Sequence, residues 1–266
     1  APESQAAVMC EHAGAGFRAN QQEDSEAAIS TCLDAWGEAE RPVAGGAGAV
    51  GVREAISTQN HVLFGVVEET SLGCAQCGRV NKSWEQFLTL RVQYQRGVEN
   101  SVQRFVDSFG QGARHDVEAV CTLQGCGAVG ARYRQQRLLR VGEYIVFLLT
   151  VYDMGQPGYP RLGGGARIRA EPTVTVRGRS YRLVGAVEHV GRSLSSGHYL
   201  SYRRQAGGLW RALNDDGVPN QARGLRHGTI LTSQELAGRQ LYVCVYALDD
   251  SAQPAPAGVG GGGDAA

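Results

Sequence analysis

Residues 195–204 read Ser-Ser-Gly-His-Tyr-Leu-Ser-Tyr-Arg-Arg, and residues 209–216 read Leu-Trp-Arg-Ala-Leu-Asn-Asp-Asp. The first segment has the alternation and aromatic content of a strand, and the second is its natural return strand. The four residues between them, Gln-Ala-Gly-Gly at 205–208, are typical of a turn. We therefore predict a β-hairpin with a histidine near its open end.

The hairpin decides which side chain meets that histidine. If Arg204 faces Leu209, then His198 faces Asp215, and residues directly opposite in an antiparallel pair have Cβ atoms roughly 5 Å apart. A slip of one residue, or a bulge, places Asn214 there instead. The sequence predicts that His198 meets an Asn or an Asp, and it leaves both open. Either neighbour can fix the tautomer of an imidazole that acts as a general base.

The hairpin stretch resembles the histidine box of the ubiquitin-specific proteases, which are papain-like cysteine deubiquitinases. Residues 181–191, Tyr-Arg-Leu-Val-Gly-Ala-Val-Glu-His-Val-Gly, are similar to the strand that precedes this box in the family. Residues 240–246, Gln-Leu-Tyr-Val-Cys-Val-Tyr, are similar to its closing strand. The resemblance extends over residues 17–248, which would be the C-terminal two-thirds of such a catalytic domain.

The resemblance implies a role for each polar residue of the hairpin. His198 would be the general base, Asn214 would be the third member of the triad, and Asp215 would be the acidic residue that follows it. The family usually has Asp at the third position, and an Asn there can orient the imidazole but cannot stabilise an imidazolium by charge. The alternative is a purely structural histidine in a β-hairpin.

Residues 17–27 resemble the Gln-Gln-Asp helix start of the same family. Asn20 is a plausible N-cap, and acidic residues follow in the first turn. The resemblance implies that Gln22 and Glu23 bind the ubiquitin tail, with Gly197 in a small loop beside the substrate channel. The alternative is an ordinary helix N-terminus whose acidic residues compensate the helix dipole.

Four cysteines come in two close pairs, Cys74 with Cys77 and Cys121 with Cys126. Tetrahedral zinc takes four such ligands, and each pair offers two of them from one turn. The two pairs resemble the zinc-binding fingers of ubiquitin-specific proteases, although the family usually spaces the second pair as Cys-x2-Cys. We expect a structural zinc ion, with a zinc-free finger or a disulfide as the alternatives.

The family's nucleophile lies in a Gly-Asn-Thr-Cys-Tyr box, and this sequence does not contain that box. Cys10 lacks the glycine turn, the Asn and the aromatic residue of that box, and a thiolate nucleophile needs an oxyanion hole. Cys32 and Cys244 fit core positions better. We therefore expect an upstream segment outside these 266 residues to supply the catalytic cysteine.

Composition excludes several classes of protein. The 26 basic and 26 acidic residues give a formal net charge of zero, which argues against a nucleic-acid binder. The longest apolar run, 144–152, is too short to span a membrane and predicts a buried strand. Seven unevenly spaced cysteines do not form a secreted disulfide framework, so we expect a location in the cytoplasm or the nucleus.

These observations predict an α+β, papain-like ubiquitin-specific protease fold with an antiparallel β palm and β-rich zinc fingers. We expect a helix over 21–39, a strand over 62–68 and a helix over 98–109. The predicted organisation is as follows: an irregular lead over 1–20, a ubiquitin-specific protease-like domain over 21–248 with fingers over about 63–150 and palm over about 138–248, and a disordered Gly/Ala/Pro tail over 249–266.

The function that this resemblance implies is hydrolysis of the isopeptide bond after the C-terminal glycine of ubiquitin, with ubiquitin or a ubiquitinated protein as partner. The part of the enzyme seen here carries the histidine box and lacks the nucleophile box. Two alternatives remain open at this point: a catalytically inactive ubiquitin-binding pseudoprotease and a zinc-dependent protein-interaction module.

Overall fold

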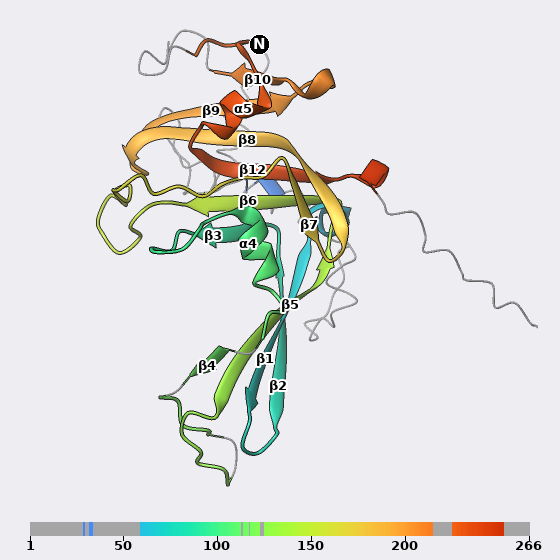
Figure 1. Cartoon of the computed structure of the whole chain (residues 1–266), viewed down its shortest axis with the longest axis vertical. Coiled ribbons are helices and arrows are strands. Elements are labelled where there is room, and N and C mark those ends of the chain that lie inside the picture. The colour runs from blue at the N-terminus through green and yellow to red at the C-terminus, as the bar shows by residue number, and fades with distance from the viewer. Residues whose placement is uncertain are drawn as a thin grey trace, which may run out of the picture.

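The computed structural model describes residues 29, 32–33, 59–112, 114–116, 118–122, 125–214 and 225–252. Two sheets dominate it, and they form a hand-like shape in which a narrow sheet extends away from a broad one (Figure 1). The helices are short. The elements in chain order are α3 (Gln59–Phe64), β1 (Val66–Cys74), β2 (Val80–Phe87), β3 (Leu90–Gln93), α4 (Val102–Asp107), β4 (Arg114–Asp116), β5 (Arg132–Val141), β6 (Tyr144–Thr150), β7 (Thr173–Val176), β8 (Arg179–Ser193), β9 (Ser196–Arg204), η2 (Ala206–Gly208), β10 (Trp210–Leu213), β11 (Ile230–Leu231), α5 (Ser233–Ala237), β12 (Leu241–Leu248) and η3 (Asp250–Ala252).

The broad sheet, which we call the palm, has the strand order β11-β10-β9-β8-β12-β6-β3, with β7 paired to β8. Its centre is made of strands that are apolar on both faces. Six of the seven residues of β6 are buried, which confirms the buried strand predicted over 144–152. Phe147 of β6 packs edge-on against Tyr246 of β12, with ring centroids 5.6 Å apart. This apolar centre holds the hairpin strands in place.

The palm is mainly antiparallel, as expected, with one parallel pair at its edge. β3 pairs with β6 in the parallel sense, with Leu90 opposite Phe147, whereas the other pairs are antiparallel. The parallel pairing is possible because a long crossover through α4, β4 and β5 returns the chain to the same edge. β3 therefore belongs to the palm although it falls within residues 63–150, the range predicted for the fingers, whereas β6 lies where that range overlaps the predicted palm range of 138–248.

The helix α4 covers one face of this edge of the palm and is shorter than the helix expected over 98–109. It begins after Ser101, whose hydroxyl accepts a hydrogen bond from the backbone N–H of Arg104 at 3.1 Å. The side chain of Asn100 instead bonds Gln95 and the carbonyl of Val98, which closes a loop before the helix. The N-cap Ser101 and the loop residue Asn100 thus set the start of the helix. The apolar periodicity alone predicts a helix that begins too early, at Val98.

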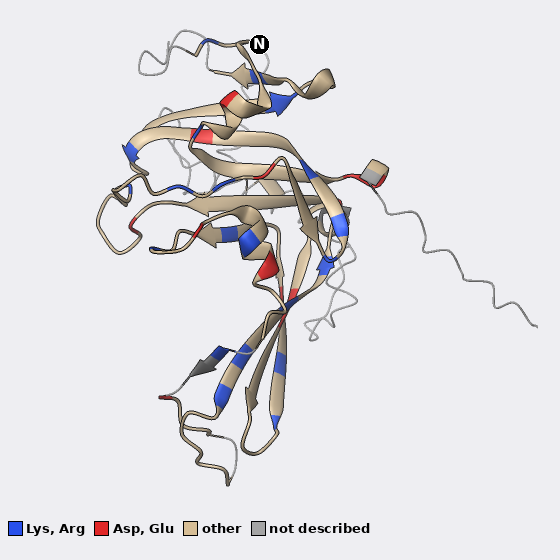
Figure 2. Cartoon of the chain, viewed as in Figure 1, with Lys and Arg blue, Asp and Glu red and all other residues tan. Residues whose placement is uncertain are grey.

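The narrow sheet, which we call the fingers, has the order β2-β1-β5-β4. Glu69 at its centre is flanked by Lys82 at 3.3 Å and by Arg137, so one carboxylate ties three strands together. Because both cations are close, the pKa of Glu69 lies below its ordinary value, with the Arg137 hydrogen bond as the largest cause. Blue segments of the ribbon mark Lys82 in β2 and the four arginines of β5 (Figure 2).

Two glycines join the fingers to the palm. A Cβ on Gly65 would lie 2.3 Å from the carbonyl oxygen of His61, and a Cβ on Gly142 would lie 2.4 Å from that of Leu63. The N–H of Gly142 donates to the carbonyl of Gly65 at 2.9 Å, and the carbonyl of Gly142 accepts from the Tyr181 hydroxyl at 2.9 Å. The strand expected over 62–68 is consequently split here, with α3 ending before Gly65 and β1 beginning after it.

At the two ends of the chain, the structure describes only part of what the sequence predicts. Ile29, Cys32 and Leu33 are helical, as expected for the helix over 21–39, and Leu33 is buried. The rest of that helix and the lead over 1–20 lie outside the described residues. The tail expected from residue 249 begins with the short helix η3, and its remainder from 253 lies outside the described residues. No helix in the described ranges is both long and apolar enough to cross a bilayer.

One ion pair at the edge of the palm gives a pH-dependent stability. The side chain of Arg182 on β8 donates to the carboxylate of Asp249, which follows β12, with Nε 2.9 Å from Oδ2. This contact lowers the pKa of Asp249 to about 2. A lowered carboxyl pKa stabilises the fold above the ordinary value near 4, and the stabilisation disappears as the pH falls toward 2.

We therefore expect Asp249→Asn to lower the melting temperature at pH 6, and the difference from the parent protein to shrink steadily between pH 4 and pH 2. Circular dichroism melts across this range measure the effect. Asp250→Asn is the control, because that exposed carboxylate lies outside the ion pair. A difference that stays constant with pH would contradict the assignment.

Candidate active site and metal centre

The hairpin predicted from residues 195–216 exists, but its turn is one residue shorter than expected. Gln205 donates its N–H to the carbonyl of Leu209 at 2.8 Å across the three-residue turn η2, in which Gly207 and Gly208 have positive φ angles. Trp210 consequently pairs with Arg204, so the predicted pairing of Arg204 with Leu209 is wrong by one position. This shift decides the neighbour of the histidine.

In the observed register, Leu213 lies opposite Ser201, so the next residue, Asn214, comes level with Leu200 on the face that also carries His198. Nε2 of His198 and Oδ1 of Asn214 are 2.5 Å apart. The alternative that the sequence left open is thus resolved in favour of Asn214, reached diagonally across the hairpin. Asp215 lies outside the described residues, as do Gln22, Glu23 and Cys10.

A short returning segment fixes the orientation of Asn214. Its Nδ2 donates to the carbonyl of Leu225 at 3.3 Å, which requires the amide nitrogen on that side and Oδ1 on the side of His198. His227 lies with Nδ1 3.0 Å from the carbonyl oxygen of Asn214. The N–H of Ala212 donates to the carbonyl of Thr229 at 2.8 Å and holds this segment against β10. Sequence reasoning missed Leu225 and His227, whose only signal is the His-Gly turn at 227–228.

The contact with Asn214 determines the tautomer of His198. An amide oxygen can only accept a hydrogen bond, so Nε2 of His198 must carry the proton. In a neutral imidazole the lone pair then lies on Nδ1, which is the atom able to take a proton from a nucleophile. Asn214 contributes orientation without a negative charge.

Gly197, one residue before the histidine, lies in a close backbone crossing. A Cβ there would come within 2.3 Å of Nε2 of His189 and 2.7 Å of the carbonyl oxygen of Val190. Gly191, on the facing strand, is similarly crowded by Ser196. These contacts give Gly197 a packing role, and its predicted contact with a ubiquitin tail stays a prediction.

The face of the hairpin opposite to His198 carries a buried polar cluster that sequence reasoning did not identify. His189 is fully buried, and its Nδ1 lies 2.7 Å from the hydroxyl of Tyr152. Arg161 donates to that hydroxyl at 2.8 Å and to the carbonyl of His189 at 2.7 Å. The ring of Tyr199 packs against that of His189, with centroids 4.6 Å apart and the ring planes tilted by 37°. Because Tyr199 directly follows His198, this cluster holds the strand that carries the candidate base.

The four predicted metal ligands come together at the tip of the fingers. The Sγ atoms of Cys74, Cys77, Cys121 and Cys126 all lie within 4.8 Å of one another, and those of Cys74 and Cys126 are 3.8 Å apart. Four sulfurs around zinc at about 2.3 Å stand about 3.8 Å apart in a tetrahedron. The cluster is therefore the right size to hold a zinc ion, as the sequence predicts.

Backbone geometry explains why the wider second pair still fits. The N–H of Ala75 donates to the carbonyl of Ala131 at 2.8 Å and brings the two cysteine turns together. Cys126 lies between Gly125 and Gly127, whose φ angles of 81° and 63° turn the chain back toward the first pair. The Cys-x4-Cys spacing is thus accommodated by two left-handed glycines.

The surroundings of Cys74 favour a thiolate. The N–H groups of Cys77 and then Gln76, together with the neighbouring thiols of Cys121 and Cys126, lower its pKa to about 7 against the opposing effect of burial. At Cys126 the N–H of Ala128 favours the thiolate, but burial and the three nearby sulfurs outweigh it and raise the pKa to about 11. Thiolates crowded together repel one another, and a bound divalent cation removes that repulsion.

The remaining described cysteines have no metal-binding geometry. Cys244 is fully buried in β12, as predicted, and burial raises the pKa of its thiol. Cys32 is exposed, so the expectation of a core thiol there is wrong; Leu33 takes the buried position next to it.

The family model of the ubiquitin carboxyl-terminal hydrolases matches residues 4–246. The chain belongs to this family. Among curated proteins, ubiquitin carboxyl-terminal hydrolase 23 of Arabidopsis thaliana is 23% identical over 171 residues, which cover 59% of this chain and 19% of the relative. The probable ubiquitin carboxyl-terminal hydrolase 16 of Schizosaccharomyces pombe is 22% identical over 169 residues, covering 61% and 36%.

Solved structures share the fold of this ubiquitin carboxyl-terminal hydrolase chain. A SAGA DUB module of Ubp8, Sgf11, Sus1 and Sgf73 bound to ubiquitin aldehyde matches 86% of the chain with a TM-score of 0.66 and 15% identity. A Ubp8 module bound to monoubiquitin matches with a TM-score of 0.63 and 17% identity. The chain spans about half the length of these structures, and less of the curated relatives. The predicted ubiquitin-specific protease fold is thereby confirmed.

For the metal centre of this family member, we expect about one zinc ion per chain by elemental analysis, and loss of that zinc in Cys74→Ser. Cys32→Ser is the matched control, because this exposed cysteine is not part of the cluster. Chelation should also lower the melting temperature of the parent protein, since metal binding contributes to folding. Zinc retention in Cys74→Ser would contradict the assignment.

For the hairpin, we expect Gly197→Ala to destabilise the fold by about 1–3 kcal/mol, because its Cβ would overlap His189 and Val190. Urea denaturation followed by circular dichroism measures the change. Gly163→Ala should have little effect, since a Cβ there meets no atom within 4 Å and the φ angle is ordinary. Equal stabilities of the two variants would show that the crossing at Gly197 can relax.

Proposed function

We propose that this chain is the part of a cysteine deubiquitinase that supplies the general base, and that the complete enzyme cleaves the isopeptide bond after the C-terminal glycine of ubiquitin. The observation that carries the proposal is the contact of His198 with Asn214, which leaves the lone pair on Nδ1. Membership of the ubiquitin carboxyl-terminal hydrolase family supports the choice of substrate.

In the proposed reaction, Nδ1 of His198 takes the proton of a cysteine thiol, which becomes a thiolate. The thiolate attacks the carbonyl carbon of the terminal glycine, a C–S bond forms, and the C–N bond to the lysine amine breaks. The imidazolium returns its proton from Nδ1 to the leaving amine. Water then attacks the thioester carbon and gives a proton to Nδ1 while a C–O bond forms. The C–S bond breaks, Nδ1 passes its proton to the cysteine sulfur, and the product leaves as a carboxylate after its remaining acidic proton goes to solvent. Asn214 holds the ring throughout, with Asp215 in support.

The nucleophile in this proposal comes from a segment that precedes the described residues. Among the described cysteines, four form the metal cluster and Cys244 is inaccessible in the core. Cys32 stands in the sequence Ile-Ser-Thr-Cys-Leu, which lacks the Gly and Asn that precede the family's nucleophile. The free thiols of the described cysteines also support the proposed location in the cytoplasm or the nucleus, where thiols stay reduced.

The first experiment measures the intact mass of the chain after incubation with ubiquitin that carries an electrophilic C-terminus. A covalent adduct would place the nucleophile within these residues, and peptide mapping would identify it. Co-elution with ubiquitin without an adduct would support a recognition and base-carrying part. The pseudoprotease alternative predicts the same result. If the chain neither forms an adduct nor binds ubiquitin, ubiquitin is not its partner.

The second experiment separates the enzyme from the pseudoprotease in the complete protein. We expect His198→Ala to lower kcat for a ubiquitin C-terminal amide by about 10²–10⁴-fold with little change in KM. The reason is that the general base acts in the chemical step and not in substrate binding. Arg211→Ala is the control, since this exposed side chain lies on the other face of the hairpin. Unchanged turnover in His198→Ala would exclude the proposed role.

A further inference from the structure

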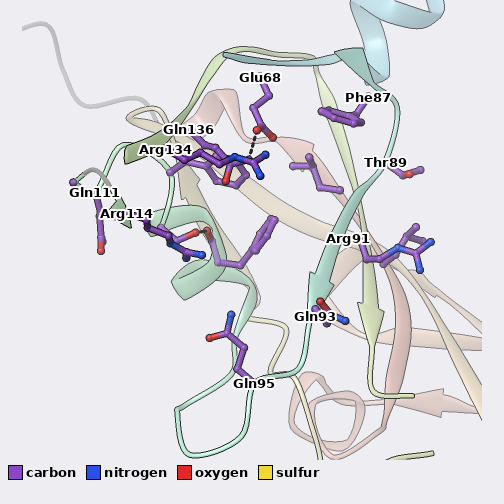
Figure 3. Close-up of a pocket in the computed structure, with 16 residues that line it drawn as sticks. Glu68, Phe87, Thr89, Arg91, Gln93, Gln95, Gln111, Arg114, Arg134 and Gln136 are labelled. Carbon is purple, nitrogen blue, oxygen red and sulfur yellow. Dashed lines mark hydrogen bonds between the residues drawn. The ribbon is translucent and has the colours of Figure 1, made fainter. Parts of the chain in front are cut away.

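A cavity of about 520 Å³ lies where the fingers meet the palm (Figure 3). Its apolar lining comes from Phe87 at the end of β2, Leu148 of β6, and Phe105 and Phe109 in and after α4. The rings of Phe105 and Phe109 meet edge to face, with centroids 5.2 Å apart. A cavity of this size can accommodate several side chains of another molecule.

The charged lining of the cavity is unbalanced. Arg91, Arg114 and Arg134 line it, and Glu68 is the one carboxylate among the lining residues. Glu68 is nearly buried and already accepts hydrogen bonds from Gln136 and, at 3.2 Å, from Thr70. In Figure 3 this glutamate lies at one end of the cavity, with Arg134 and Gln136 beside it and Arg114 farther along. The cavity therefore carries an excess of positive charge.

Two of these arginines form a like-charged pair across the sheet. Arg114 of β4 lies directly opposite Arg134 of β5, and both side chains are exposed. Like charges in directly opposite positions destabilise a sheet. Within the described parts of the chain, neither arginine forms an ion pair with a carboxylate. An anion bound between them would replace this repulsion by two attractions.

The palm contains a second such pair, which shows what is particular to the first. Arg203 of β9 lies opposite Arg211 of β10, and both are exposed. That pair lines none of the five main cavities formed by the described residues, whereas Arg114 and Arg134 line an opening that also holds Phe105 and Phe109. The combination of paired guanidinium groups and an apolar recess distinguishes Arg114 and Arg134 from the second pair.

We propose that this cavity, which we call the finger–palm cavity, binds a carboxylate-rich segment of a protein partner. Guanidinium groups bind carboxylates through two parallel hydrogen bonds. Aspartate or glutamate side chains would lie between Arg114 and Arg134, and a neighbouring apolar residue would enter the recess beside Phe105. The partner is thus an acidic peptide segment with an apolar residue in it.

A protein segment fits this surface better than a nucleic acid does. A nucleic acid needs a row of cations along its phosphates, but the chain has no net charge and Glu68 lies within the cavity. The recess also offers glutamine amides, such as Gln93 and Gln136, that can bond a peptide backbone. The proposal does not depend on the catalytic role of His198, because the cavity lies away from the hairpin.

The test uses fluorescence anisotropy with the full chain and a labelled ten-residue peptide of eight glutamates and two phenylalanines. We expect binding that weakens as salt rises, and a loss of about tenfold or more in affinity in the double variant Arg114→Gln/Arg134→Gln. The matched control is Arg203→Gln/Arg211→Gln, which removes the same charge from an equivalent cross-strand pair and should bind as the parent protein does. Circular dichroism melts establish that both variants are folded.

Two further probes complete the test. In Arg114→Glu/Arg134→Glu, the preference should reverse toward a peptide of eight lysines and two phenylalanines. Equal losses in the two glutamine double variants would overturn the proposal, since general electrostatic attraction would then explain the binding. Tighter binding of a ten-nucleotide uridine RNA than of the acidic peptide, lost in Arg114→Gln/Arg134→Gln, would also overturn it.

Discussion

The pairing of β8 with β9 is the contact on which the candidate active site depends. β8 is fifteen residues long, and it pairs with β12 of the apolar palm on one side and with β9 on the other. The position of His198, opposite Val190, is therefore set by a ladder of strand pairs that starts in the apolar core. A one-residue shift would turn the imidazole to the other face, where Tyr199 and the buried His189 now lie.

The buried cluster behind the hairpin makes this register specific. A fully buried histidine, a tyrosine and an arginine are costly to remove from water unless each is hydrogen-bonded, and His189, Tyr152 and Arg161 bond one another. An alternative register would separate these partners and leave polar groups buried without them. The apolar core favours a sheet, and the polar cluster selects one arrangement of its strands.

The sequence predicts the hairpin, the buried strand β6, and the four cysteines of the metal cluster, because each depends on local spacing or on a recognisable box. It does not predict which residue meets His198, since that depends on whether the turn at 205–208 has three or four residues. Asn214 meets His198 because Gly207 and Gly208 adopt positive φ angles in the turn, which sets the register. The carbonyl of Leu225, eleven residues farther along the chain, then orients the Asn214 amide. Arg161 is likewise invisible to a local pattern, as it reaches the hairpin from a long loop.

The junction of fingers and palm has a consequence for how such a domain can change during evolution. Gly65 and Gly142 are bonded to each other through their backbones, and neither has room for a side chain. These two positions can therefore carry no side chain larger than a hydrogen atom, whereas at the far end of the fingers exposed turns connect the four cysteines of the cluster. Insertions and deletions can accumulate in those turns. The length of the fingers can therefore vary during evolution while their orientation relative to the palm stays the same.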